Sequence, residues 1–169
     1  LKPGGGGNIA SQFVARAPPD GHALLMITGS FTITPAFGNL PFDPVKDFAA
    51  ISLLSRRAIV LAVTPSLPVN TFAEYVAYAK ANPDKLNWGD QGPGTSFHLA
   101  GVLLGNATGT KVTFVHYKGS AQNYTDLMAG RVHVSPMSMV STLPLVKSGK
   151  VRVIASLTGE RSQIGRAHV

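Results

Sequence analysis

Short apolar runs alternate with amphipathic stretches along most of the chain. Apolar runs at Ala23–Thr28, Ile51–Leu54 and Ala58–Thr64 predict buried strands, because each has the length of a strand and is too short for a buried helix. Four further strands are expected at Lys85–Trp88, Thr110–His116, Val132–Pro136 and Lys150–Leu157.

Helices are predicted between these strands. Thr71 and Glu74 have the spacing of a capping box, so a helix should begin there and end at Asn82-Pro83-Asp84. A second helix should begin near Phe97, with Leu99, Val102 and Leu103 facing the core. Two more are expected at Ser120–Ala129, ended by Gly130, and at Leu143–Lys147.

Strands and helices in alternation predict an α/β fold, with a mostly parallel sheet covered by helices. Ligands of such sheets bind beyond the carboxyl ends of the strands. Two glycine-containing turns follow predicted strands, Thr28-Gly29-Ser30 and Gly89–Ser96. These two turns are therefore the places where the sequence predicts a ligand site.

The strongest candidate site is the turn Gly92-Pro93-Gly94-Thr95-Ser96. Glycine allows the backbone to approach a ligand closely, and Thr95 and Ser96 stand where a helix should begin. The unpaired first-turn N–H groups of a helix attract anions, so this turn could hold a carboxylate without a side-chain cation. The alternative is simple capping, for which Thr and Ser are favoured in any helix.

Three other positions are weaker candidates for ligand contact. Thr28, Gly29 and Ser30 could face the same cleft from the opposite side, or could form a hydroxyl-rich turn without a ligand. His98 lies one turn into the second helix, where a histidine is more often a structural hydrogen-bonding group. Trp88 could equally be part of the core or of the cleft wall.

Composition narrows the classes of function. The chain is 44% hydrophobic and 14% charged, and it has no cysteine, which excludes disulfides, thiolate zinc sites and a cysteine nucleophile. No apolar run approaches the ~20 residues of a membrane helix. The formal charge of +7 favours anionic partners, but the basic residues are scattered, so no nucleic acid partner is expected.

Signatures of catalysis are missing from the sequence. It has no G-x-S-x-G elbow, no phosphate-binding loop with its lysine, no histidine pair at metal-binding spacing and no close pair of acids. No catalytic residue, metal or cofactor is therefore expected. A small-molecule enzyme, such as an ester hydrolase or transferase, stays as the alternative because catalytic triads are rarely local in sequence.

Several segments in the same order resemble the Bug-type receptors of tripartite tricarboxylate transporters. The resemblance runs from residue 3 to about residue 162. It is carried by Pro3–Ile9, Ala17–Gly21, Leu40–Phe48, Thr64–Pro68, Ala79–Pro83, Gly92–Ala100 and Tyr117–Ala121.

This resemblance implies a two-lobed fold of the type II periplasmic-binding-protein kind. Residues 1–54 would form part of the first lobe, 55–150 a complete second lobe and 151–163 a strand returning to the first lobe. The chain is expected to be a fragment, with the first lobe truncated at both ends. Residues 164–169 match the translation of a common sequencing adapter and are expected to be a non-native tail.

The function implied by the resemblance is capture rather than chemistry. Such a receptor is periplasmic, although no signal peptide is visible here, and it acts as a monomer. It would close its two lobes on a small carboxylate and deliver it to the membrane permease subunits of the transporter. Gly92, Gly94, Thr95, Ser96 and His98 would then hold the ligand from one side, and the turn at Thr28-Gly29-Ser30 from the other.

Overall fold

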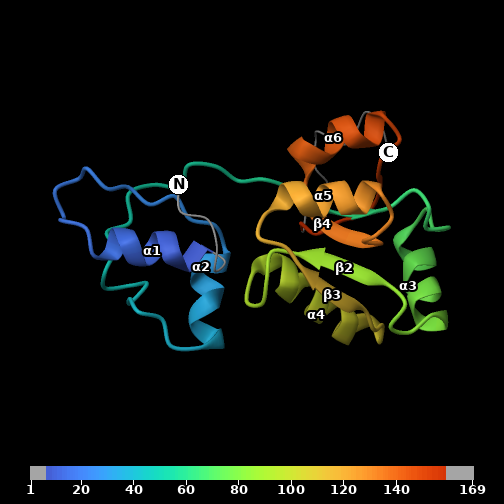
Figure 1. Cartoon of the computed structure of the whole chain (residues 1–169), viewed down its shortest axis with the longest axis horizontal. Coiled ribbons are helices and arrows are strands. Elements are labelled where there is room, and N and C mark those ends of the chain that lie inside the picture. The colour runs from blue at the N-terminus through green and yellow to red at the C-terminus, as the bar shows by residue number, and fades with distance from the viewer. Residues whose placement is uncertain (1–6, 159–169) are drawn as a thin grey trace.

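The computed structural model describes residues 7–158, which form a five-stranded sheet with helices on both faces and an irregular segment that precedes it (Figure 1). The strands are β1 (Ile59–Val63), β2 (Asn87–Asp90), β3 (Thr113–His116), β4 (Val134–Ser138) and β5 (Arg152–Ser156). The helices are α1 (Asn8–Ala15), α2 (Ser30–Ile33), the 3-10 turn η2 (Thr34–Phe37), α3 (Phe72–Ala81), α4 (Ser96–Thr108), α5 (Ser120–Met128) and α6 (Met139–Lys147).

The sheet has the order β3-β2-β4-β1-β5 and is mixed. β2 is parallel to both β3 and β4, as the alternation of strands and helices predicted. β1 is antiparallel to both of its neighbours, β4 and β5, which the sequence pattern did not indicate. The carboxyl ends of β2, β3 and β4 therefore share one edge of the sheet with the amino end of β1.

The two faces of the sheet carry separate apolar layers. Along β1, Leu61 and Val63 face the layer formed with α3 and α4, while Val60 and Ala62 face the layer formed with α5 and α6. All four of these side chains are almost completely buried. A strand that is buried on both faces has apolar residues at successive positions. β1 could therefore be predicted from the sequence.

The predicted start of α3 is confirmed by a side-chain cap, whereas α6 begins at Met139, four residues before the predicted start at Leu143. The Thr71 hydroxyl accepts a hydrogen bond from the Glu74 backbone N–H, and the Glu74 carboxylate accepts one from the Asn70 N–H, at 3.2 and 2.7 Å. The face of α4 was predicted incorrectly, because Leu103 is 58% exposed. Phe97 and Gly101 are instead the buried positions of that helix, four residues apart on one side.

Two of the predicted strands, at residues 23–28 and 51–54, are wrong. Both segments are irregular, and Met26 and Ile51 are 82% and 81% exposed. A strand is stabilised by hydrogen bonds to a neighbour, and no strand in the described part of the chain lies beside either segment. Residues 31–48 are tied together instead by edge and stacking contacts among Phe31, Phe42 and Phe48.

The strand predicted near the end of the chain is β5, which pairs with β1 in the same sheet. Residues 159–163 of the expected return strand and the expected tail at 164–169 lie outside the described residues. The division of the chain into two lobes stays a prediction. No helix within residues 7–158 is long and apolar enough to cross a membrane.

Candidate functional site

The loop between β2 and α4 is folded by its two left-handed glycines. Gly92 and Gly94 have φ angles of 110° and 76°, which residues with a side chain rarely adopt. The Thr95 N–H and hydroxyl both donate to the Gly92 carbonyl, at 3.2 and 2.7 Å. The two glycines are therefore required by the turn itself, and the turn places α4 directly after the sheet edge.

Thr95 is the N-cap of α4. Its hydroxyl accepts a hydrogen bond from the His98 N–H at 3.3 Å, and its side chain is 4% exposed. The first turn of α4 itself contains no acidic residue, which leaves its N–H groups free of an acidic side chain from the same turn. The predicted helix start at Thr95-Ser96 is confirmed, whereas ligand binding there stays a prediction.

Ser30 is brought to this helix end from a distant part of the sequence. Its hydroxyl accepts a hydrogen bond from the Ser96 N–H at 3.2 Å and lies 3.4 Å from the Ser96 hydroxyl. Of the three positions predicted in the first turn, Ser30 alone has a contact with the α4 turn in the described structure. Thr28 and Gly29 are exposed, and their carbonyls accept bonds from the backbone of α2.

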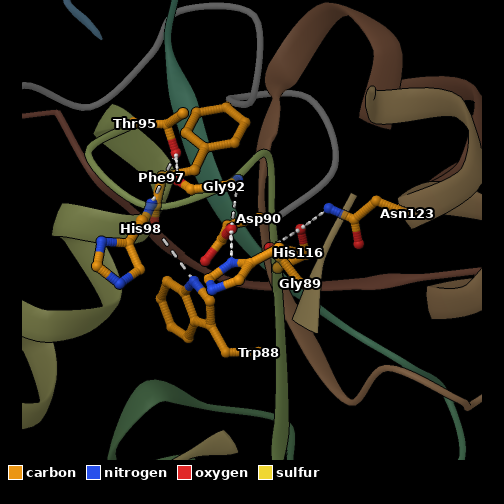
Figure 2. Close-up of polar contacts among 10 residues, drawn as sticks. Trp88, Gly89, Asp90, Gly92, Thr95, Phe97, His98, His116 and Asn123 are labelled. Carbon is orange, nitrogen blue, oxygen red and sulfur yellow. Dashed lines mark hydrogen bonds and ion pairs between the residues drawn. The ribbon is translucent and has the colours of Figure 1, made fainter. Parts of the chain in front are cut away.

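His98 lies on the other side of the same helix turn, against β3. Its ring centroid is 4.8 Å from that of Phe114 and 5.7 Å from that of His116. Its Nδ1 is buried without a hydrogen-bond partner among residues 7–158. Trp88 belongs to the core, since it is 1% exposed and its indole N–H donates to the Phe97 carbonyl at 3.1 Å (Figure 2).

Two residues at the strand ends carry polar chemistry that the sequence pattern did not reveal. Asp90 is completely buried, and its Oδ1 accepts from the Gly92 N–H at 2.7 Å and lies 2.6 Å from His116 Nδ1 (Figure 2). The residues are 26 positions apart and meet because Asp90 and His116 are paired in the parallel register of β2 and β3. The available signal was that His116 ends one predicted strand and Asp90 lies in the turn directly after another.

A second group of buried polar side chains fixes the end of β2, directly before the loop. Asn123 of α5 donates to the Ser135 hydroxyl at 2.9 Å, and that hydroxyl donates to the Gly89 carbonyl at 3.0 Å. A Cβ on Gly89 would overlap the Asn123 side chain, so this close approach requires glycine. The end of β2 is thereby fixed to both α5 and β4.

Asp126, in the last turn of α5, binds one residue that precedes this helix and one that follows it. Tyr117 donates to Asp126 at 2.8 Å, and Asp126 pairs with Arg131 at 2.7 Å. Burial, with the hydrogen bond to Asp126, raises the pKa of Tyr117 to about 12, so this hydroxyl stays a donor. The same hydrogen bond, helped by Arg131, lowers the pKa of Asp126.

In the described residues, no three histidine, cysteine, aspartate or glutamate side chains lie close enough together to hold a metal ion.

The sequence of this chain is similar to those of curated proteins. The chain is 34% identical over 164 residues to a UPF0065 protein of Cupriavidus necator, and 33% identical over 162 residues to one of Agrobacterium vitis. These alignments cover 95% of this chain but 49% and 47% of the relatives. The chain therefore spans about half the length of the curated relatives it matches.

Solved structures agree with the fold. Rpa4515 of R. palustris, solved with adipate, is 35% identical with a TM-score of 0.87 over 92% of this chain and 52% of that one. The periplasmic binding protein BugD is 31% identical with a TM-score of 0.88, over 95% of this chain and 54% of that one. MatC from Rhodopseudomonas palustris, with bound malate, is 26% identical with a TM-score of 0.85, over 97% of this chain and 56% of that one.

The family of tripartite tricarboxylate transporter receptors matches residues 1–164, nearly the whole chain. The resemblance inferred from the ordered sequence segments is thereby confirmed, as is the α/β periplasmic-binding-protein fold. This chain belongs to the tripartite tricarboxylate transporter receptor family.

Proposed function

We propose that the protein captures a small carboxylate at the α4 turn and carries out no reaction on it. The observation that carries this proposal is the meeting of Ser30 and Ser96 at the N-terminus of α4, across 66 residues of sequence. Relatives solved with adipate and with malate support a carboxylate as the solute. Family membership supports a periplasmic location and delivery to permease subunits of a tripartite transporter.

The mechanism is an exchange of hydrogen-bond partners. In the structure the Ser96 N–H donates to the Ser30 hydroxyl. A carboxylate oxygen entering the turn takes that N–H, because an ionised acceptor makes the stronger bond. The Ser30 hydroxyl then turns and donates to the carboxylate. The positive end of α4 favours the charge, and ordered water completes the remaining hydrogen bonds.

The proposal is tested by calorimetric titration with adipate, malate and citrate. We expect binding of one ligand per chain without product formation, and a rise in apparent melting temperature with ligand concentration. Because the chain spans half of its relatives, the titration is run in parallel on a version extended to their length. Absence of binding in both forms would contradict a carboxylate receptor, and conversion of the ligand would favour an enzyme.

Substitutions locate the binding to the turn. Losing a hydrogen bond to a charged group costs about 1.5–3 kcal/mol, so Ser30→Ala should weaken binding about 10- to 100-fold. Ser148→Ala is the matched control, because that serine is exposed at the end of α6 and its hydroxyl donates only to nearby carbonyls. Equal affinities in the two variants would place the ligand elsewhere.

A further inference from the structure

The proposed capture mechanism gives no role to the ionisable group nearest the ligand loop. Asp90 is the last residue of β2 and is completely buried directly before the ligand loop. Its Oδ1 contacts both the Gly92 N–H and His116 Nδ1, whereas its Oδ2 is buried without a partner in the described residues. A buried carboxylate with so few partners is costly unless its charge is compensated.

His116 is the group placed to compensate that charge. Its Nδ1 lies 2.6 Å from Asp90 Oδ1, and its side chain is 40% exposed, so it can exchange protons with solvent. Within residues 7–158 no other basic group is within salt-bridge distance of Asp90. Asp90 is thus balanced by an imidazole, the side chain that proteins most often use as a pH-dependent charge.

The other titratable groups around the pair are accounted for. His98 on α4 faces His116 with ring centroids 5.7 Å apart, and Phe114 stacks on the His116 ring. Near the end of α5, Asp126 is occupied by Tyr117 and Arg131. Lys118 follows β3 and is exposed. Among residues 7–158, His98 is therefore the one further histidine whose ring lies against the pair.

The protonation state of His116 changes the charge directly beneath the loop. When His116 is protonated, the pair is neutral overall and its hydrogen bond is charge-assisted. When His116 is neutral, Asp90 leaves one uncompensated negative charge beside the Gly92 N–H. A carboxylate ligand bound at the α4 turn is then opposed by a like charge, and low dielectric surroundings strengthen that repulsion.

We propose that Asp90 and His116 form a pH-dependent positioning pair that strengthens anion binding at the α4 turn when His116 is protonated. This inference rests on the proposed carboxylate function. The direction of the pH dependence follows from linkage between proton and ligand binding. If the ligand prefers the protonated pair, ligand binding takes up a proton, so the affinity for the ligand rises as the pH falls.

The first measurement uses no ligand and follows the Gly92 amide resonance of the chain between pH 5 and 8. We expect it to shift along the titration of His116, since both groups share Asp90 Oδ1. His116→Asn should abolish the shift, while His22→Asn, at an exposed histidine in an irregular segment, should leave it. A Gly92 amide that does not move overturns the inference whatever the ligand result.

The second measurement is the affinity for adipate or malate at pH 6 and pH 8, where the ligand carboxylates are largely ionised. We expect about three- to tenfold tighter binding at pH 6, from one unit charge acting across a partly screened site. His116→Asn should bind at both pH values as the unchanged protein does at pH 8. Asp90→Asn keeps an acceptor for Gly92 and should restore tight binding at pH 8.

The Asp90→Asn result separates this inference from a structural role. Loss of a merely structural contact would weaken binding at both pH values, and that outcome, or an unchanged pH profile in His116→Asn, overturns the proposal. If the Gly92 amide follows His116 but no carboxylate binds at any pH, the proposed function fails. The coupling of the pair to the loop would in that case be supported by the resonance data alone.

Discussion

Gly101 is the position in α4 where two physical effects of one methyl group oppose each other. In a helix interior, Gly→Ala is stabilising by about 1 kcal/mol through backbone entropy. A Cβ at Gly101 would, however, lie 2.7 Å from Trp88 Cε2 and from Phe114 Cε1, and 2.9 Å from Trp88 Nε1. Carbon atoms in contact prefer about 3.5–4.0 Å, so the rings would have to move.

The rings are poorly placed to move. Trp88 is 1% exposed and is held by its hydrogen bond to the Phe97 carbonyl. Overpacking costs about 1–3 kcal/mol and loss of that hydrogen bond about 1 kcal/mol, against a helix gain of about 1 kcal/mol. Gly101→Ala should therefore lower the free energy of unfolding by about 2 kcal/mol.

Urea denaturation followed by fluorescence measures this change, because Trp88 is the single tryptophan of the chain. Asn106→Ala is the matched control, since it is exposed on the same helix and should stabilise by about 0.5 kcal/mol. The emission of folded Gly101→Ala should also change as the indole shifts. Unfolding of Gly101→Ala at the same or higher urea concentration than the unchanged protein would refute the reasoning.

Three further predictions concern the framework of the site. Thr95→Val removes the cap of α4 and should destabilise by about 2 kcal/mol, more than Thr95→Ser, which keeps both hydrogen bonds; urea midpoints of the two variants decide this. Gly89→Ala should yield little folded protein, because its Cβ overlaps Asn123; a native circular-dichroism spectrum would contradict this. Burial lowers the pKa of His133, whose Nδ1 accepts from the Asn87 N–H, so its contribution to stability is present above about pH 6.5 and is lost as the pH falls below it. His133→Gln should reduce the difference in urea midpoint between pH 7.5 and pH 5.5, and an unchanged difference would exclude this histidine as the cause.

Local signals explain what could be predicted from the sequence. The capping pair Thr71 and Glu74 located α3, and the Gly-Pro-Gly-Thr-Ser pattern located the turn before α4, because capping and turn formation depend on a few adjacent residues. β1 was found because a strand buried on both faces is apolar throughout. These elements need no knowledge of distant partners.

Pairing across the sequence explains what could not be predicted. The run at 23–28 is apolar, as a buried strand would be, but no strand of the described chain lies beside it. An apolar segment without a neighbouring strand has no partner for the backbone hydrogen bonds of a sheet. Asp90 and His116 become partners only through the register of β2 with β3. Ser30 could be named as a candidate from its turn, yet its contact with Ser96 depends on the folded path of 66 residues.

The reversed direction of β1 decides where the sheet is joined to the rest of the chain. The segment entering β1 arrives at Ile59, which is paired with Ser138 at the carboxyl end of β4. The segment leaving β5 departs beside the same point, where the Leu157 N–H donates to the Ile59 carbonyl at 2.8 Å. Both connections therefore lie at the sheet edge that carries the α4 turn, so any rotation of the sheet about them would displace that turn less than the opposite edge of the sheet.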